Sequence, residues 1–331
     1  MKKFINNVDE ILTESLTGFG VAHNDILEVK LKPDFVTRKQ KSEKNPKVAL
    51  ISGGGSGHEP LHGGFVGYGM LDAACPGQVF SAPTPDQMEA AAKYVHSGKG
   101  ILFIVKNYSG DIMNFEMGAD MLDLEHQTII VNDDVAVEDS TYTTGRRGVA
   151  GTMIVEKTVG SLAETGASLD ECKNFGDHVN KMTASMGVAF TSCTVPAAGK
   201  PTFDIGSDEM EFGVGIHGEP GRKREKIKTA NEITSKLMGA ILKDLKPSNN
   251  QEVLLHANGF GGTPLMELYL LFNSAKKILD QNNIKVTRSL IGNFTTSLDM
   301  AGGSLTVAKL DDKIVQHWDS PVHTPAMRWK I

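Results

Sequence analysis

The fold of this chain is limited above all by the alternation of short, unbroken apolar runs with stretches of helical periodicity. Residues 48–51, 101–105 and 128–131 are apolar runs of strand length, and residues 85–96 place their apolar side chains on one helical face. Strands separated by helices predict an α/β unit with a largely parallel sheet. Functional loops in such sheets follow the carboxyl ends of the strands, so the segments after the first two strands are searched first.

A boundary between two units is predicted at residues 196–201, where small and turn-forming residues concentrate, and a second unit follows it. It has strand-like apolar runs at 253–256 and 304–308 and a helical stretch from about 231 to 245. A further helix is expected to start at Thr263-Pro264, with threonine as the N-cap and proline at the first helical position. These elements predict a second α/β unit.

The chain of 331 residues has room for about two domains of ordinary size. We assign residues 1–190 to an N-terminal α/β domain with the substrate-binding loops, and residues 191–331 to a C-terminal α/β domain. The expected fold class is α/β, with two domains that each hold a mixed or largely parallel sheet flanked by helices.

Composition and charge exclude several classes of protein. The formal net charge is −6, so nothing favours binding to nucleic acid or to an anionic membrane surface. No stretch approaches the ~20 apolar residues of a membrane span, and the N-terminus has no apolar signal region. The three cysteines, Cys75, Cys172 and Cys193, fit neither a disulfide framework nor a zinc knuckle. We therefore expect a cytoplasmic protein.

The first motif that could carry chemistry is the glycine-rich segment 53–60, Gly-Gly-Gly-Ser-Gly-His-Glu-Pro, directly after a strand. Its backbone amides are able to cradle a polar ligand, with His58 beside it. It is not a Walker A loop, because no Lys-Ser/Thr follows. Residues 58–62 match His-Glu-x-x-His, but Pro60 prevents the two histidines from sharing a helical face, so we predict no zinc site. A flexible turn is the alternative interpretation.

The second motif is Lys-Asn-Tyr-Ser-Gly-Asp at residues 106–111, at the end of the second strand. Asp111 in this loop can act as a general base, and Lys106 can donate a hydrogen bond to a substrate oxygen. The competing interpretation is that Asp111 caps a helix that starts near Ile112. Asp111 can serve both as a helix cap and as a general base only if its carboxylate also reaches the substrate-binding pocket.

The third motif is Glu-Phe-Gly-Val-Gly-Ile-His-Gly-Glu-Pro-Gly at residues 211–221. As a strand, it would place His217 on the same face as Gly213 and Gly215, so that two positions before the histidine lack a side chain. Glycine within a strand often marks close approach by a ligand or by another backbone segment. His217 is therefore either a site residue or a structural histidine.

Together these segments, with Gly-Arg-Arg-Gly-Val-Ala-Gly at residues 145–151, resemble the dihydroxyacetone kinase family over nearly the whole chain. The family usually has threonine where Ser109 stands, a change that keeps the hydroxyl group. Some members of that family fuse this module to a helical nucleotide-binding domain, whereas phosphotransferase-system members keep it as a separate subunit. Because the sequence has no room for the helical domain after its second unit, we expect the free-standing dihydroxyacetone-binding subunit.

The resemblance implies a role for each site residue. His217, in the C-terminal domain, would form a covalent hemiaminal with the ketone of dihydroxyacetone through Nε2. Asp111 would accept the proton of the reacting hydroxyl, and His58 would hydrogen-bond the substrate and assist proton transfer. Lys106 and the Gly55-Ser56-Gly57 backbone would hold the other oxygens.

The resemblance also implies partners. ADP or ATP with magnesium would be bound by a separate ADP-binding kinase subunit, recharged by a phosphocarrier that takes its phosphoryl group from phosphoenolpyruvate. No cofactor would be held by this chain itself, and the chain would form a homodimer. The expected activity is a phosphoenolpyruvate-glycerone phosphotransferase of glycerol metabolism. The alternative is a non-catalytic paralogue that binds dihydroxyacetone as a signal and acts as coactivator of a transcription regulator.

Overall fold

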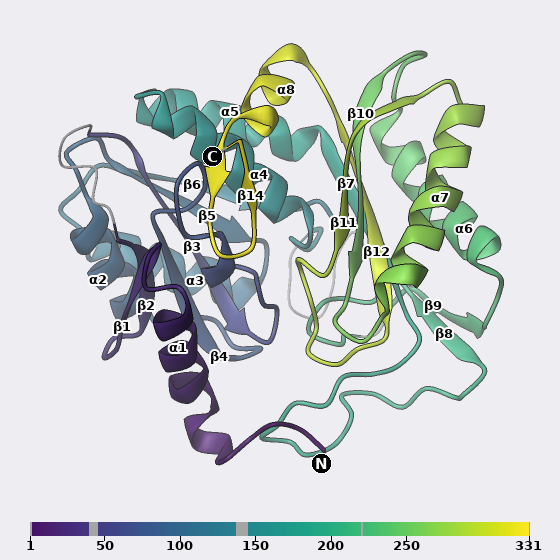
Figure 1. The fold of residues 1–331 in the computed structure, drawn as a ribbon, viewed down its shortest axis with the longest axis horizontal. Coiled ribbons are helices and arrows are strands. Elements are labelled where there is room, and N and C mark those ends of the chain that lie inside the picture. The colour runs from purple at the N-terminus through teal and green to yellow at the C-terminus, as the bar shows by residue number, and fades with distance from the viewer. Residues whose placement is uncertain (1, 40–45, 137–144, 220, 331) are drawn as a thin grey trace.

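The computed structural model describes residues 2–39, 46–136, 145–219 and 221–330. Within these residues, two six-stranded sheets lie on either side of a shared layer of helices, with further helices on the outer face of each sheet (Figure 1). This arrangement confirms the expected α/β class with two mixed sheets flanked by helices. Pro220, within the third motif, lies outside the described residues.

The first sheet is built from strands β1 to β6. They are β1 (Leu27–Lys30), β2 (Phe35–Arg38), β3 (Ala49–Ser56), β4 (Ala73–Val79), β5 (Ile101–Lys106) and β6 (His126–Val131). Their order is β1-β2-β4-β3-β5-β6, with β4, β3, β5 and β6 mutually parallel and the β1–β2 hairpin antiparallel at one edge. The largely parallel core was predicted from the sequence. The glycines 53–55 were expected in a loop, but they lie inside β3, which continues to Ser56.

The second sheet is mainly antiparallel. Its strands are β7 (Thr183–Ala189), β8 (Glu209–Phe212), β9 (Lys223–Lys226), β10 (Glu252–Gly259), β11 (Lys285–Gly292) and β12 (Gly302–Lys309). Their order is β11-β10-β12-β7-β8-β9, and only the β10–β11 pair is parallel. The strand expected over residues 211–217 ends at Phe212, because the chain turns at Gly213 with a positive φ of 71°.

Helices lie on both faces of each sheet. They are α1 (Ile11–Ala22), α2 (Pro85–Val95), α3 (Ser109–Asp120), α4 (Gly151–Glu164), α5 (Leu169–Lys181), α6 (Ala230–Leu245), α7 (Leu265–Gln281) and α8 (Asp312–Asp319). Short 3-10 turns lie at η1 (Val8–Glu10) and η2 (Gly63–Phe65), and a hairpin joins β13 (Val322–His323) to β14 (Arg328–Trp329). In Figure 1, α4, α5 and α8 lie between the sheets, and α6 and α7 lie outside the second sheet. Helix α7 begins one residue later than expected, with Pro264 as its N-cap.

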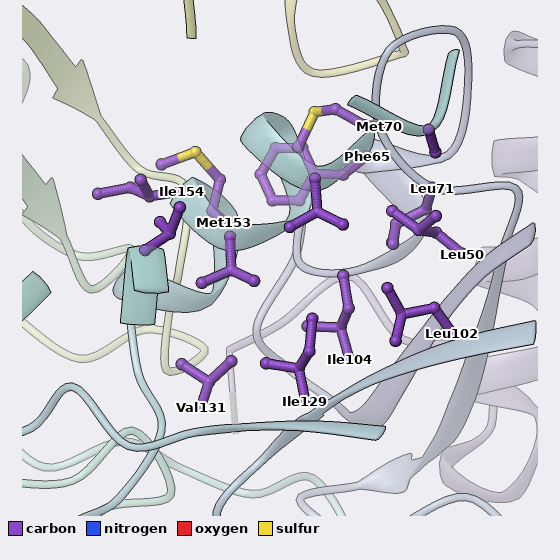
Figure 2. Packing of buried hydrophobic residues seen from close by; sticks show 14 of the residues in the cluster. Leu50, Phe65, Met70, Leu71, Leu102, Ile104, Ile129, Val131, Met153 and Ile154 are labelled. Atoms are coloured by element: carbon purple, nitrogen blue, oxygen red, sulfur yellow. The ribbon is translucent and has the colours of Figure 1, made fainter. Parts of the chain in front are cut away.

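The largest apolar cluster lies between the first sheet and the central helices. Figure 2 shows Ile104 and Ile129 of the sheet close to Met153 of α4. The same cluster includes Trp318 of α8 and Leu254 of β10, so the last helix and the second sheet contribute to the core of the first unit. Burial of this shared apolar surface holds the two units together.

The chain crosses between the two units more than once. Strand β7 ends at Ala189 yet pairs within the second sheet, and a bridge between Tyr68 and His323 ties the C-terminal hairpin to the first unit. The domain boundary near residue 190 stays a prediction. Among the helices of the described residues, none combines the length and the apolar character needed to cross a membrane.

Candidate active site

A cleft of about 610 Å³ opens where the ends of β3 and β5 meet the turn after β8. It joins both units, because residues of the first sheet face residues 217–219 across it. Its walls are formed by Gly55, Phe80, Ala82, Tyr108, Ser109, Gly110, Asp111, Thr202, His217, Gly218 and Glu219. The structure therefore brings parts of all three motifs to one place. The first two lie at the carboxyl ends of the parallel strands β3 and β5, as expected, whereas the third follows the antiparallel strand β8.

The glycines of the first motif make room for atoms of the protein itself. A Cβ on Gly53 would lie 2.5 Å from the Cys75 carbonyl, and a Cβ on Gly55 would lie 2.7 Å from the Ser81 nitrogen. A Cβ on Gly54 would overlap the Nζ atom of Lys106. Most of the space that the sequence suggested for a ligand is thus occupied, and Gly55 alone of the three lines the cleft.

His58 is buried and has a defined tautomer. Its Nδ1 donates to the Thr296 carbonyl at 2.7 Å, and its Nε2 is buried with no hydrogen-bond partner in the described part of the chain. Burial lowers the pKa of His58 well below its usual range, and the nearby His217 and Lys106 act in the same direction. The ring is therefore neutral at pH 7 and has its lone pair on Nε2. His58 is not part of the cleft wall itself, but its ring packs against His217, which is.

His217 lies on the turn after β8 with part of its side chain exposed to the cleft. Its backbone N–H donates to Glu219 Oε2 at 2.9 Å, and its Nδ1 lies 3.2 Å from Glu219 Oε1. Burial acts to raise the pKa of Glu219, but His217 and Arg147 lower it to about 2. The carboxylate is ionised and accepts a hydrogen bond from the Nδ1–H group of His217, which leaves the lone pair of the ring on Nε2.

Buried Arg147, from the fourth segment used for the resemblance, supports this arrangement. Its Nε donates to Asp134 Oδ2 at 2.7 Å, and one terminal nitrogen donates to the Gly213 carbonyl at 2.7 Å. A Cβ on Gly215 would meet the Glu219 carboxylate and the Arg147 guanidinium, so this glycine admits the charged pair rather than a ligand. Arg147 thereby ties the first unit to the turn that carries His217.

Aromatic rings enclose the two histidines. The ring centroids of His58 and His217 are 4.7 Å apart and nearly perpendicular, Phe80 stacks on His58 at 5.0 Å, and Tyr108 meets His217 edge-on at 4.5 Å. Such packing restricts both imidazoles to one orientation. The residues that sequence analysis placed in two different domains are thus held in contact.

Asp111 is not the N-cap of a helix that starts near Ile112, because α3 starts at Ser109 and its N-cap is Tyr108. Asp111 lies in the first turn of α3, lines the cleft, and pairs with Lys106 through Oδ2 at 3.3 Å. The expected capping role is therefore wrong, and the role of Asp111 as a general base stays a prediction.

The other predicted binding groups are only partly free. Ser56 Oγ donates to the Gly77 carbonyl at 2.7 Å, and the Gly57 N–H donates to the Glu59 carboxylate at 3.0 Å. Lys106 is fully buried and is not part of the cleft wall. The roles of these groups in binding substrate stay predictions.

The zinc interpretation of residues 58–62 has no support in the geometry. These residues form turns, and the Nδ1 atoms of His58 and His62 are directed to the Thr296 carbonyl and to Glu156. No group of three or more potential metal ligands occurs among the described residues.

Sequence reasoning missed several residues of this site. Glu219 and Arg147 were present in the quoted motifs but received no role, and Thr296 comes from a distant loop with no motif. The spacing His-x-Glu is the one signal that could have indicated Glu219, because a carboxylate two residues away can reach back to an imidazole.

Comparisons with known proteins identify the family of the chain. A family model described as the Dak1 domain matches residues 17–326. The chain is 44% identical to the PEP-dependent dihydroxyacetone kinase, dihydroxyacetone-binding subunit DhaK of Escherichia coli K12, with 99% of both chains covered. It is 48% identical to the PTS-dependent DhaK subunit of Lactococcus lactis, with 94% of both chains covered.

Two solved structures share the fold. The dihydroxyacetone kinase operon co-activator DhaQ superposes with a TM-score of 0.90 at 32% identity and covers 97% of this chain and 98% of its own. The dihydroxyacetone kinase of C. freundii superposes with a TM-score of 0.88 at 30% identity, over 98% of this chain and 60% of that chain. The chain therefore belongs to the Dak1 family.

Proposed function

We propose that this chain is the dihydroxyacetone-binding subunit of a phosphoenolpyruvate-dependent kinase that converts dihydroxyacetone to dihydroxyacetone phosphate. The observation that carries the proposal is the His217 imidazole, oriented by an ionised carboxylate at the wall of a cleft that also exposes Asp111. The near full-length similarity to DhaK subunits supports the same substrate.

In the proposed mechanism, His217 Nε2 attacks the ketone carbon of the substrate. A bond forms between Nε2 and carbon, the π electrons of the carbonyl move to its oxygen, and that oxygen takes up one proton from bulk solvent, so that the adduct gains one positive charge. The ring becomes cationic, and Glu219, already ionised, neutralises the charge. Glycerol has no carbonyl group, so this step selects against it.

The adduct fixes the terminal hydroxyl for phosphoryl transfer, which is mainly a matter of positioning. Asp111 accepts the hydroxyl proton as the oxygen–phosphorus bond forms and the bond from phosphorus to ADP breaks. His58 Nε2 accepts a hydrogen bond from a substrate hydroxyl, because the tautomer fixed by Thr296 leaves that atom unprotonated.

The phosphoryl donor is proposed to be nucleotide with magnesium on a separate ADP-binding subunit, recharged through a phosphocarrier. We further propose a homodimer in the cytoplasm. The bacterial relatives are named as dihydroxyacetone-binding subunits of PEP- or PTS-dependent kinases. Their names support the proposal that substrate and nucleotide are bound by different subunits. The odd number of cysteines supports a reducing compartment.

A coactivator that senses dihydroxyacetone is the second candidate, favoured by the DhaQ structure. A sensor needs His217 for capture but has no use for Asp111 as a base. The presence of Asp111 in the cleft wall, paired with Lys106, favours the enzyme.

Reconstitution with an ADP-binding subunit and its phosphocarrier tests the proposal. We expect phosphoenolpyruvate consumption that depends on dihydroxyacetone, and an adduct on His217 by mass spectrometry.

Asp111→Asn is expected to keep the adduct and to lose turnover by about 10²–10⁴-fold, the usual contribution of a general base. Asp120→Asn, at the exposed end of the same helix, is the control. Full activity of Asp111→Asn would show that Asp111 is not the general base. If the wild-type protein forms the dihydroxyacetone adduct but does not turn over, the protein is a sensor.

A further inference from the structure

A continuous chain of buried polar groups runs from the cleft into the first unit. Asp111 Oδ2 contacts Lys106 Nζ at 3.3 Å, Lys106 Nζ contacts His62 Nε2 at 3.1 Å, and His62 Nδ1 contacts Glu156 Oε1 at 2.6 Å. These four residues come from α3, β5, the segment after β3, and α4. Only Asp111 of the four lines the cleft.

The hydrogen bonds of Lys106 show how it is held. An ammonium group has three N–H donors, and here the acceptors are the Gly53 carbonyl at 3.2 Å, His62 Nε2 and the Asp111 carboxylate. The side chain is fully buried, and these three contacts hold the ammonium group against the Asp111 carboxylate.

His62 has the protonation state that this geometry requires. Burial lowers the pKa of His62 well below its usual range, and the charge of Lys106 and the ring of His58 act in the same direction. A neutral ring that accepts from Lys106 at Nε2 carries its proton on Nδ1, and that proton is donated to Glu156. Lys106, which can only donate, therefore fixes the tautomer of His62. The ring is oriented at Nδ1 by Glu156 Oε1 at 2.6 Å and Ser52 Oγ at 3.0 Å.

The backbone is shaped around this chain. A Cβ on Gly54 would overlap Lys106 Nζ and would lie 3.5 Å from His62 Nε2. Gly54 is thus a second, independent feature that reserves space for the ammonium group and its histidine partner.

We propose that His62, oriented by Glu156, is a positioning residue that holds the Lys106 ammonium against Oδ2 of Asp111. The second carboxylate oxygen then remains for the substrate hydroxyl. This inference rests on the proposed role of Asp111, and it assigns the histidine of the apparent zinc motif to the phosphoryl-transfer step. His217 and its adduct lie outside the chain of contacts.

Amide variants separate the two hydrogen bonds of His62. In His62→Gln the side-chain amide lies near the former position of Nε2, so an acceptor for Lys106 is kept. In His62→Asn the amide lies near the former position of Nδ1, so the contact with Glu156 is kept and the one with Lys106 is lost. We expect His62→Asn to lower kcat by about ten- to a hundredfold, the effect of one buried hydrogen bond to a charged group. His62→Gln is expected to recover most of that loss, and the KM for dihydroxyacetone and the adduct on His217 are expected to change little in both.

Three outcomes overturn the proposal: unchanged kcat in His62→Asn, equal loss in the Asn and Gln variants, or parallel loss of adduct and turnover. A crystal structure of each variant gives a readout that needs no activity. Lys106 Nζ should leave Asp111 in His62→Asn and remain beside it in His62→Gln, and an unmoved Lys106 in His62→Asn also overturns the proposal. If the wild-type protein neither forms the ketone adduct nor phosphorylates it, the proposed function is wrong. The crystal structures of the two variants still decide whether His62 positions Lys106.

Discussion

At the scale of single residues, one carboxylate decides what His217 can do. Glu219 binds both the backbone N–H and the ring Nδ1 of the histidine, so it fixes the position of the ring as well as its tautomer. A nucleophilic imidazole needs its lone pair on the atom that faces the substrate. Against the effect of burial, His217 itself and then the charge of Arg147 lower the pKa of Glu219, so a residue outside the cleft wall contributes to the reactivity of His217.

Glu219→Gln tests this arrangement. Glutamine keeps the shape but removes the negative charge that stabilises the cationic ring of the adduct, so we expect the affinity for dihydroxyacetone to fall by at least about tenfold. Isothermal titration and intact-mass measurement of the adduct give the result. Glu267→Gln, on the exposed surface of α7, should bind like the wild type, and an unchanged affinity in Glu219→Gln would show that Nδ1 needs no anionic partner.

The resemblance implied that His217, His58 and Asp111 share one site, and the structure places them near one another: His217 and Asp111 line the cleft, and His58 packs against His217. The sequence did not indicate Glu156 or Thr296, since a helix interior and a loop hundreds of residues from the motif carry no local pattern that marks a hydrogen-bond partner. Their contacts arise only when the chain folds.

At the scale of elements, the glycines have a different role from the one the sequence suggested. Gly53 and Gly54 are strand residues of β3 whose missing side chains admit neighbouring atoms, and Gly215 admits the Glu219–Arg147 pair. A count of glycines indicates close approach, but it does not say whether a ligand or the protein approaches. The strand interpretation of residues 213–217 failed for a related reason, because alternation cannot reveal a turn that a positive φ at Gly213 introduces.

Gly215→Ala and Gly239→Ala are a matched pair that tests the role of missing side chains. The added methyl at position 215 meets Glu219 and Arg147, so we expect the dihydroxyacetone adduct to be weakened severely. Gly239 lies on the exposed face of α6 with nothing within 4 Å of the added Cβ, so its replacement should raise the free energy of unfolding by about 0.5–1 kcal/mol. Adduct mass and urea unfolding of both variants provide the measurements, and a normal adduct in Gly215→Ala would contradict the assignment.

At the scale of the whole molecule, buried acids make stability depend on pH. Burial raises the pKa of Glu156 to about 8 from an ordinary value of 4.5. The folded protein therefore keeps a proton that the unfolded chain loses as the pH rises between these two values, so Glu156 lowers stability progressively across that window. Each pKa unit corresponds to about 1.4 kcal/mol, which makes the total effect a few kcal/mol.

Glu156→Gln removes this titration and keeps an oxygen acceptor for His62. We expect the variant to gain stability relative to the wild type as the pH rises from about 5 to about 8, measured by urea unfolding at several pH values. A constant difference between the two proteins over this range would show that Glu156 is already ionised when folded.

The largely parallel first sheet and the class of the second unit followed from the sequence, whereas the connection between them did not. Apolar runs specify that a segment is buried, but they do not specify which of two cores it enters. Helix α8 and the final hairpin follow the second sheet in the chain yet pack into the first core, and this choice depends on long-range complementarity with residues such as Met153.

That return has a consequence for biosynthesis. During translation the first core lacks Trp318 and the hairpin until the second sheet has been synthesised, so the nascent N-terminal half carries an incomplete apolar surface up to that point. Folding of the first core is consequently completed only after the residues that supply His217 have been made.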